Sequence, residues 1–151
     1  MPNTFYEKQK FSAPFFNGIY YGTVLIILLV AAQENIWIAT GVGFFALGSY
    51  FLLTQLLFLE IKLDEKGIRY RLNPFHSKMR LMEWDIIDSY RTISLNALEF
   101  GGYGIRKTLK KTAYIVRSGA GLQVELNSGK VIVFSIKNRT TLDAFLSDLK
   151  Y

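Results

Sequence analysis

Two long apolar stretches, residues 15–32 and 36–59, stand out in the N-terminal part of the chain. Neither contains a Lys, Arg, Asp or Glu, and the break between them is Gln33, Glu34 and Asn35. A helix needs about 20 apolar residues, at about 1.5 Å rise each, to cross the hydrocarbon core of a bilayer. A soluble domain of this size cannot bury two helices that are apolar on every side. The pattern therefore predicts a two-helix transmembrane hairpin over residues 15–59, with a polar tip at residues 33–35.

Beyond residue 59 apolar and polar positions alternate, which is typical of β-strands. Residues 60–63 and 68–72 alternate around a turn at residues 64–67, and this predicts a β-hairpin directly after the second apolar stretch. Residues 96–111 lack the alternation and are expected to be irregular. Five further strands are predicted at residues 78–84, 89–95, 113–117, 122–126 and 131–136.

The last predicted element is an amphipathic helix that begins near residue 140. Thr140 is the expected N-cap, with Asp143 three residues later as an approximate capping box. The apolar positions follow helical spacing and form one stripe, which consists of Leu142, Phe145, Leu146 and Leu149. Such a helix would cover one open end of a bent sheet. We therefore expect a mainly-β domain, a seven-stranded antiparallel bent sheet or barrel capped by a C-terminal helix.

Composition and charge add a topology to this organisation. The 151 residues are divided into an N-terminal lead (1–14), the hairpin (15–59) and the β-domain (60–151). The net charge is +6; Lys8 and Lys10 precede the hairpin, its tip carries only Glu34, and all other Lys and Arg residues follow residue 59. The positive-inside rule then predicts a multi-pass protein of the cell membrane with both termini in the cytoplasm. A signal peptide cleaved near residues 30–32 is the rival interpretation, but its apolar core would be too long.

Catalysis has little support in the sequence. With no Cys and only one His, the chain lacks a disulfide, a thiolate nucleophile and a multi-histidine metal site. His76 follows a turn proline without a recognisable nucleophile and is expected to be a solvated loop residue. The glycines at residues 101, 102 and 104 match neither a phosphate-binding loop nor a dinucleotide fingerprint. We predict no enzyme, cofactor or metal, and no nucleic-acid binding, because membrane topology accounts for the positive charge.

Small residues occur at helix-packing spacing in both apolar stretches. Gly18 and Gly22 lie four residues apart in the first, and Ala39 and Gly43 in the second. Small residues at this spacing let two helix backbones approach closely. They are expected to pack the two helices of one hairpin together, and a homodimer interface is the alternative.

The strongest candidate site is a basic cluster in the irregular segment. Arg106, Lys107, Lys110 and Lys111 lie close together there, and Tyr103 is close enough to anchor the segment. Each Lys or Arg near an anionic leaflet contributes about 1 kcal/mol to membrane attraction. The cluster is expected to bind lipid or a partner, and a solvated loop is the alternative.

Several short segments, in order and spacing, resemble those of bacterial pleckstrin-homology-like (PH-like) domains. The similar segments are residues 64–71, 84–86, 103–106, 113–114 and 122–126. In that family such domains follow transmembrane hairpins in small membrane proteins of uncharacterised function. The resemblance implies a binding or scaffolding module without catalytic residues. A phosphoinositide-binding signature is missing from the first predicted turn, where Glu65 and a single Lys66 lie.

These observations predict a membrane-tethered PH-like interaction module at the cytoplasmic face. Its partner would be an unidentified protein or anionic lipid headgroups. The alternative is a structural accessory subunit of a larger membrane complex, assembled through the transmembrane hairpin.

Overall fold

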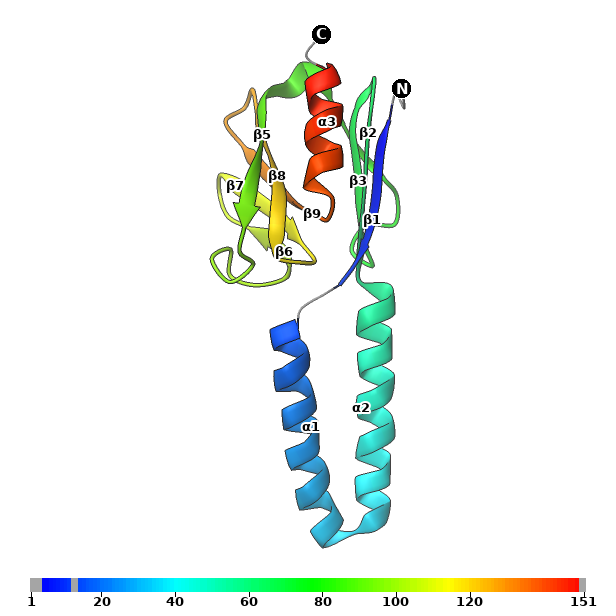
Figure 1. Cartoon of the computed structure of the whole chain (residues 1–151). Helices are drawn as coiled ribbons and strands as arrows, with labels where there is room; N and C mark the ends of the chain where they lie inside the picture. Colours follow the sequence, from blue (N-terminus) through cyan, green and yellow to red (C-terminus); the bar gives the residue numbers. More distant parts are fainter. Residues whose placement is uncertain (1–3, 12–13, 150–151) are drawn as a thin grey trace. The chain divides into compact units, whose positions relative to one another are not determined.

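The computed structural model describes residues 4–11 and 14–149 and divides the chain into two compact units (Figure 1). One unit is a helix pair within residues 12–56, and the other is a β-domain formed by residues 1–11 and 57–151. The chain thus enters the β-domain, leaves it for the helix pair, and returns.

The helix pair consists of α1 (Pro14–Glu34) and α2 (Ile36–Leu56), with Asn35 between them. The Tyr20 hydroxyl of α1 donates a hydrogen bond to the Ala46 carbonyl oxygen of α2 at 2.5 Å and lies 3.0 Å from the Ser49 hydroxyl. The polar tip predicted at residues 33–35 is reduced to Asn35, because Gln33 and Glu34 continue α1.

The second helix ends at Leu56, not at residue 59 as the sequence predicted. Phe58–Asp64 forms a strand instead, in which Leu59, Ile61 and Leu63 are fully buried. An apolar run has no polar residues to mark its helix end, so only the packing of Leu59 in the core distinguishes strand from helix here.

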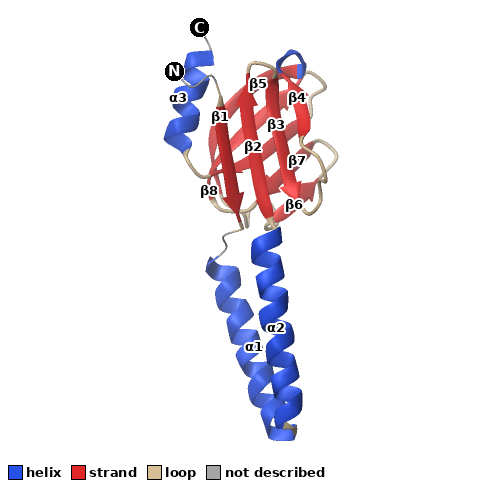
Figure 2. Ribbon diagram, turned by 90° about the vertical axis from the view of Figure 1, so that its right-hand side faces the viewer, coloured by secondary structure: helices blue, strands red, loops and turns tan. Residues whose placement is uncertain are grey.

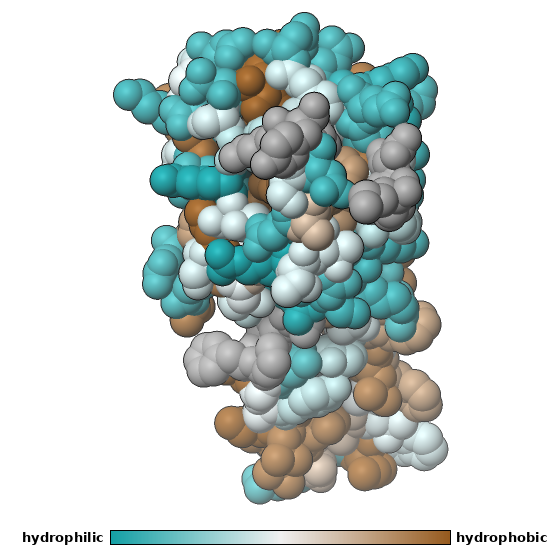
Figure 3. Space-filling model, turned by 45° about the horizontal axis from the view of Figure 1, so that its top comes forward, coloured by the Kyte–Doolittle hydropathy of each residue, from teal (hydrophilic) through white to brown (hydrophobic). Residues whose placement is uncertain are grey.

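Among the described helices α2 is long and apolar enough to cross a membrane, whereas the apolar part of α1, Asn17–Gln33, falls short of that length. Large apolar side chains are exposed along both helices, and the visible face of the helix pair in Figure 3 is mostly hydrophobic.

The first sheet of the β-domain has the order β1-β2-β3-β4, with all neighbours antiparallel (Figure 2). The turn between β2 and β3 requires glycine at position 67, because its φ is +146° and a Cβ atom would overlap the carbonyl oxygen of Met82. The strands are β1 (Phe5–Lys10), β2 (Phe58–Asp64), β3 (Gly67–Asn73) and β4 (Arg80–Glu83).

The second sheet has the order β5-β8-β9-β7-β6 and follows a short 3-10 helix, η1 (Trp84–Ile86). Its pairs are antiparallel except for β7 and β9, which run parallel. The strands are β5 (Ile87–Leu95), β6 (Gly104–Lys107), β7 (Lys111–Ile115), β8 (Gly119–Leu126) and β9 (Val131–Ile136).

The main core lies between the two sheets. Leu72 of β3, Val124 of β8 and Phe134 of β9 are fully buried in it, together with Leu142 of α3 (Arg139–Leu149). A second, smaller cluster covers the outer face of the second sheet, where residues from 93 to 103 pack on β7 and β9. Both faces of β7 and β9 are therefore covered, which explains the nearly continuous apolar sequence of β9.

The C-terminal helix is confirmed, with two differences in detail. It begins at Arg139, so Thr140 lies in its first turn and is not the N-cap. Leu142 and Leu146 are buried as predicted, whereas Phe145 is only partly buried and packs 6.4 Å from the ring of Phe5. The side chain of Leu149 lies outside the described part of the structure.

The mixed helix and β architecture was predicted correctly, but the number and pairing of strands were not. The described residues form nine strands in two sheets, whereas seven antiparallel strands were expected. One additional strand, β1, lies in the segment interpreted as a lead (1–14), and another, β6, lies in the segment expected to be irregular.

Candidate functional site

The predicted basic cluster lies on a β-hairpin and not in an irregular segment. Arg106 and Lys107 belong to β6, Lys111 begins β7, and Lys110 lies in the turn between them. Arg106 pairs with Ala113 in the sheet register. The expectation of an irregular segment was therefore wrong for this part, because the strand is too short to show an alternation.

Three hydrogen bonds hold the turn of this hairpin. The Thr108 amide donates to the Lys111 carbonyl oxygen at 2.7 Å, and the Lys111 amide donates to the Thr108 hydroxyl oxygen at 3.1 Å. The amide of Val131, the first residue of β9, donates to the Lys110 carbonyl oxygen at 2.8 Å. The turn is thus fixed to the body of the second sheet.

A leucine that the sequence analysis did not single out lies in this turn. Leu109 is 99% exposed, the highest value among the large apolar side chains whose burial is described. Lys107 and Lys110 on either side are also exposed, as is Lys130, the residue before Val131. We call Lys107, Leu109, Lys110 and Lys130 the basic tip.

The other two predicted cations lie on the outer face of the second sheet and contact the domain itself. The Lys111 ammonium lies 4.2 Å from the centre of the Phe100 ring, and the Arg106 guanidinium occupies the space where a Cβ of residue 102 would be. Between them is a shallow depression of about 390 Å³, lined by Glu99, Phe100, Arg106, Thr108, Lys111 and Ala113.

Tyr103 packs against the same outer-face cluster as Phe100, but it lies away from the basic tip. Its ring packs edge-on against Phe11 at 5.3 Å, and it precedes Gly104 at the opposite end of β6 from the basic tip. The Phe11 amide donates to the carbonyl oxygen of Leu57 at 3.0 Å. Tyr103 therefore packs beside the two segments that lead to and from the helix pair.

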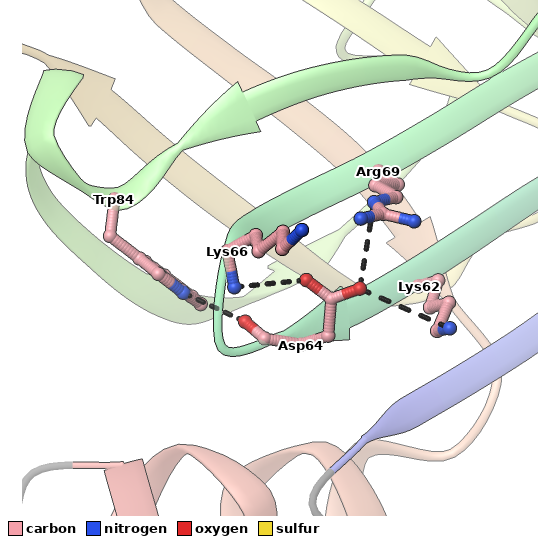
Figure 4. Close-up of polar contacts among 5 residues, drawn as sticks. All are labelled: Lys62, Asp64, Lys66, Arg69 and Trp84. Atoms are coloured by element: carbon pink, nitrogen blue, oxygen red, sulfur yellow. Dashed lines mark hydrogen bonds and ion pairs between the residues drawn. The ribbon is translucent and has the colours of Figure 1, made fainter.

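The basic tip differs from the β2–β3 turn in how its charges are used. At the β2–β3 turn the Asp64 carboxylate pairs with Lys62 at 3.9 Å and Arg69 at 3.5 Å (Figure 4). The backbone carbonyl oxygen of Asp64 accepts a hydrogen bond from the Trp84 indole at 2.8 Å. By contrast, no residue of the basic tip makes an ion pair with any described residue.

His76 is not the solvated loop residue that the sequence predicted. It is only 6% exposed, lies among the rings of Tyr70 and Tyr114, and accepts a hydrogen bond at Nδ1 from the Leu72 amide at 3.3 Å. Burial, and to a smaller extent the charge of Arg80, lower the pKa of His76. Burial, with a contribution from Tyr70, raises the pKa of Tyr114.

The structure brings together only some of the predicted helix-packing residues. Ala39 is buried, and the backbone of Gly43 lies against the side chain of Leu28. Gly18 and Gly22 have open space where a Cβ would be added. The α2 residues thus take part in packing within the helix pair, whereas the two glycines of α1 do not.

No group of three or more acidic, His or Cys side chains gathers to hold a metal ion in the described part of the chain. Comparisons with known protein families, with curated proteins and with solved structures found no match to this chain.

Proposed function

We propose that this chain is a membrane-anchored binding module. In this proposal the helix pair spans the cell membrane, and the β-domain has PH-like architecture and lies at the cytoplasmic face. There it binds a protein partner or anionic lipid. The observation that carries the proposal is the exposure of large apolar side chains along both helices.

Exposure of this kind is unfavourable in water. On α2, Trp37 is 80% exposed, Phe45 78% and Leu47 67%; on α1, Ile26 is 64% exposed. Contiguous apolar surfaces of more than a few hundred Å² are rare on soluble monomers, and they mark membrane or protein contacts. The α2 helix has 21 residues, which corresponds to about 31 Å, close to the thickness of the hydrocarbon core.

The positions of the aromatic residues support a helix pair that spans the membrane. Tyr20 and Tyr21 of α1 cluster with Tyr50 of α2, with ring centroids 5.2–5.9 Å apart, and Trp37 lies near the turn at the other end. Tyr and Trp are enriched at both membrane–water interfaces. The two-sheet core with its C-terminal helix supports the PH-like architecture.

Cysteine labelling tests this proposal directly, because the natural chain has no cysteine. In intact cells, a membrane-impermeant maleimide should label the Asn35→Cys variant. The Ser128→Cys variant, in an exposed turn of the β-domain, should react only after permeabilisation. Labelling of Ser128→Cys in intact cells would contradict the topology. Extraction of the protein by alkaline carbonate would contradict membrane spanning.

The open face at Gly18 and Gly22 favours a second candidate function, assembly of a larger membrane complex through the helices. Small residues that are unused within the helix pair are available for another transmembrane helix. Gly22→Leu should then remove a partner that co-purifies in detergent, and quadruple Lys/Arg→Gln substitution of residues 106, 107, 110 and 111 should not. The opposite result would favour binding through the β-domain.

A further inference from the structure

The basic tip combines an apolar side chain with exposed cations on a fixed turn. Leu109 is 99% exposed even though the turn that carries it is held by hydrogen bonds to Thr108, Lys111 and Val131. These bonds fix the backbone, so a partner that receives Leu109 has little backbone entropy to overcome. A leucine held in this position is poorly placed for the core of its own domain.

The cations of the basic tip are exposed, as Leu109 is. Lys107 and Lys110 flank Leu109 in the sequence, and Lys130 lies next to them because the amide of Val131 bonds to the Lys110 carbonyl oxygen. None of the three makes an ion pair with a described residue. By comparison, Lys62 at the β2–β3 turn lies beside the Asp64 carboxylate.

We propose that the basic tip docks on an anionic lipid bilayer. Leu109 enters the boundary between headgroups and acyl chains, and Lys107, Lys110 and Lys130 lie at the level of the phosphates. This inference rests on the proposed function and identifies the ligand of the β-domain. A single leucine on a projecting turn, surrounded by lysines, is complementary to a negatively charged, deformable surface. Protein interfaces are instead centred on packed pockets with few lysines.

The test uses the full chain reconstituted in vesicles. An environment-sensitive fluorophore is attached to Leu109→Cys, which is the only thiol of that variant because the natural chain has none. The vesicles contain phosphatidylcholine alone or with phosphatidylglycerol added. In anionic vesicles we expect a blue-shifted emission and protection from the neutral quencher acrylamide. Both effects should disappear as salt shortens the Debye length from about 10 Å at 0.1 M to about 3 Å at 1 M.

Charge variants sharpen the test. Each of the substitutions Lys107→Gln, Lys110→Gln and Lys130→Gln should reduce the ratio of docked to undocked tip about fivefold in anionic vesicles. Lys62→Gln, which changes the net charge equally but lies in β2 of the other sheet, should have little effect. An equal loss from Lys62→Gln would overturn the proposal, because only the overall charge would then matter.

A second labelled position separates this inference from the proposed function. A fluorophore at Leu47→Cys, in the middle of α2 and 67% exposed, should report lipid in both kinds of vesicle. If position 47 reports lipid and position 109 reports water in both kinds, the docking proposal is wrong and the membrane anchor stands. If position 109 is equally buried in neutral vesicles, recognition of anionic lipid is wrong. If position 47 reports water, the proposed function fails and this inference fails with it.

Discussion

The β-domain closes one side of its core with two neighbouring elements that use opposite chemistry. β1 and α3 lie close together, as the contact between Phe5 and Phe145 indicates (Figure 2). α3 contributes Leu142 and Leu146, which are 0% and 6% exposed. β1 contributes Phe5 and also two polar side chains, Glu7 and Gln9, which are 6% and 2% exposed.

The buried polar side chains of β1 form a hydrogen-bonded network with distant parts of the chain. The Glu7 carboxylate accepts hydrogen bonds from the amides of Lys137 at 2.7 Å and Asn138 at 2.9 Å, and from the Gln9 amide group at 2.5 Å. Gln9 also donates to the Ser135 carbonyl oxygen at 2.7 Å. β1 is thereby tied to the end of β9 and the start of α3.

This difference shows two ways to hold a terminal element in place. Apolar burial depends on the area removed from water and has little directionality. A buried polar network stabilises only one arrangement, because every donor and acceptor must find its partner. α3 therefore contributes apolar burial, whereas the hydrogen bonds of β1 to residues 137 and 138 fix where the start of α3 lies.

The largest predicted effect comes from removing apolar burial by α3. Leu142→Ala should lower the free energy of unfolding of the β-domain by about 2–5 kcal/mol, because a fully buried leucine leaves a cavity. Denaturant unfolding of the detergent-solubilised chain, followed by near-UV circular dichroism, measures this loss. Phe145→Ala is the matched variant on the same helix, and it should cost less because Phe145 is only partly buried. A loss well below about 2 kcal/mol for Leu142→Ala would contradict the assignment of Leu142 to the core.

The second largest effect comes from disrupting the buried hydrogen-bond network of β1. Glu7→Ala should cost about 1–3 kcal/mol, because the amides of Lys137 and Asn138 lose their acceptor in a buried place. Amide hydrogen exchange should accelerate at residues 137 and 138. Glu7→Gln, which keeps one acceptor oxygen, should lie between the natural chain and Glu7→Ala. Unchanged exchange at both amides would show that β1 does not fix the start of α3.

The same comparison explains which elements the sequence could predict. α3 was recognisable because Leu142 and Leu146 repeat at helical spacing, and β2 and β3 because Ile61, Leu63 and Ile68 alternate with polar residues. β1 was not recognisable because Glu7 and Gln9 face inward, so polar residues occupy both faces of the strand. A buried polar residue shows its role only when its distant partners are known.

The candidate site was predictable in composition but not in arrangement. The basic residues were identified from their clustering, yet the pairing of β6 with β7 separates Tyr103 from Lys110 and directs Arg106 and Lys111 to the outer face. Leu109 carried no distinguishing signal, because an exposed and a buried leucine are identical in a sequence. The turn that exposes it is held in part by the hydrogen bond from Val131 of β9, a residue distant in the sequence.

A buried polar group that titrates should respond to pH as well as to mutation. His76 is held in its neutral form, because burial and Arg80 lower its pKa and the Leu72 amide requires an acceptor at Nδ1. The unfolded chain binds a proton near pH 6.5, whereas the folded domain does so only at lower pH. Stability should therefore be fully present above about pH 6.5 and decrease as the pH falls below it, by at most about 1.4 kcal/mol per pH unit.

His76→Phe provides the control for this pH dependence. The rings of Tyr70 and Tyr114 surround the site, so phenylalanine retains the aromatic packing and removes the proton. Unfolding curves between about pH 7.5 and 5.5 should show a flatter dependence on pH in this variant, even if its stability is lower throughout. The same slope in both proteins would assign the pH dependence to another group.

The smallest predicted effect concerns Asp143, a carboxylate of α3 that lies outside the core. Asp143 pairs with Arg139 at 3.4 Å, and both side chains are about half exposed, at 46% and 54%. The pair is oriented with the cation toward the helix N-terminus, which the helix dipole disfavours. Asp143→Ala should therefore change the free energy of unfolding by about 0.5 kcal/mol or less. The double variant with Glu7→Ala should show an additive loss, because the two carboxylates share no hydrogen-bond partner. A coupling larger than about 0.5 kcal/mol would mean that the two carboxylates act together at the start of α3, and that burial does not separate their roles.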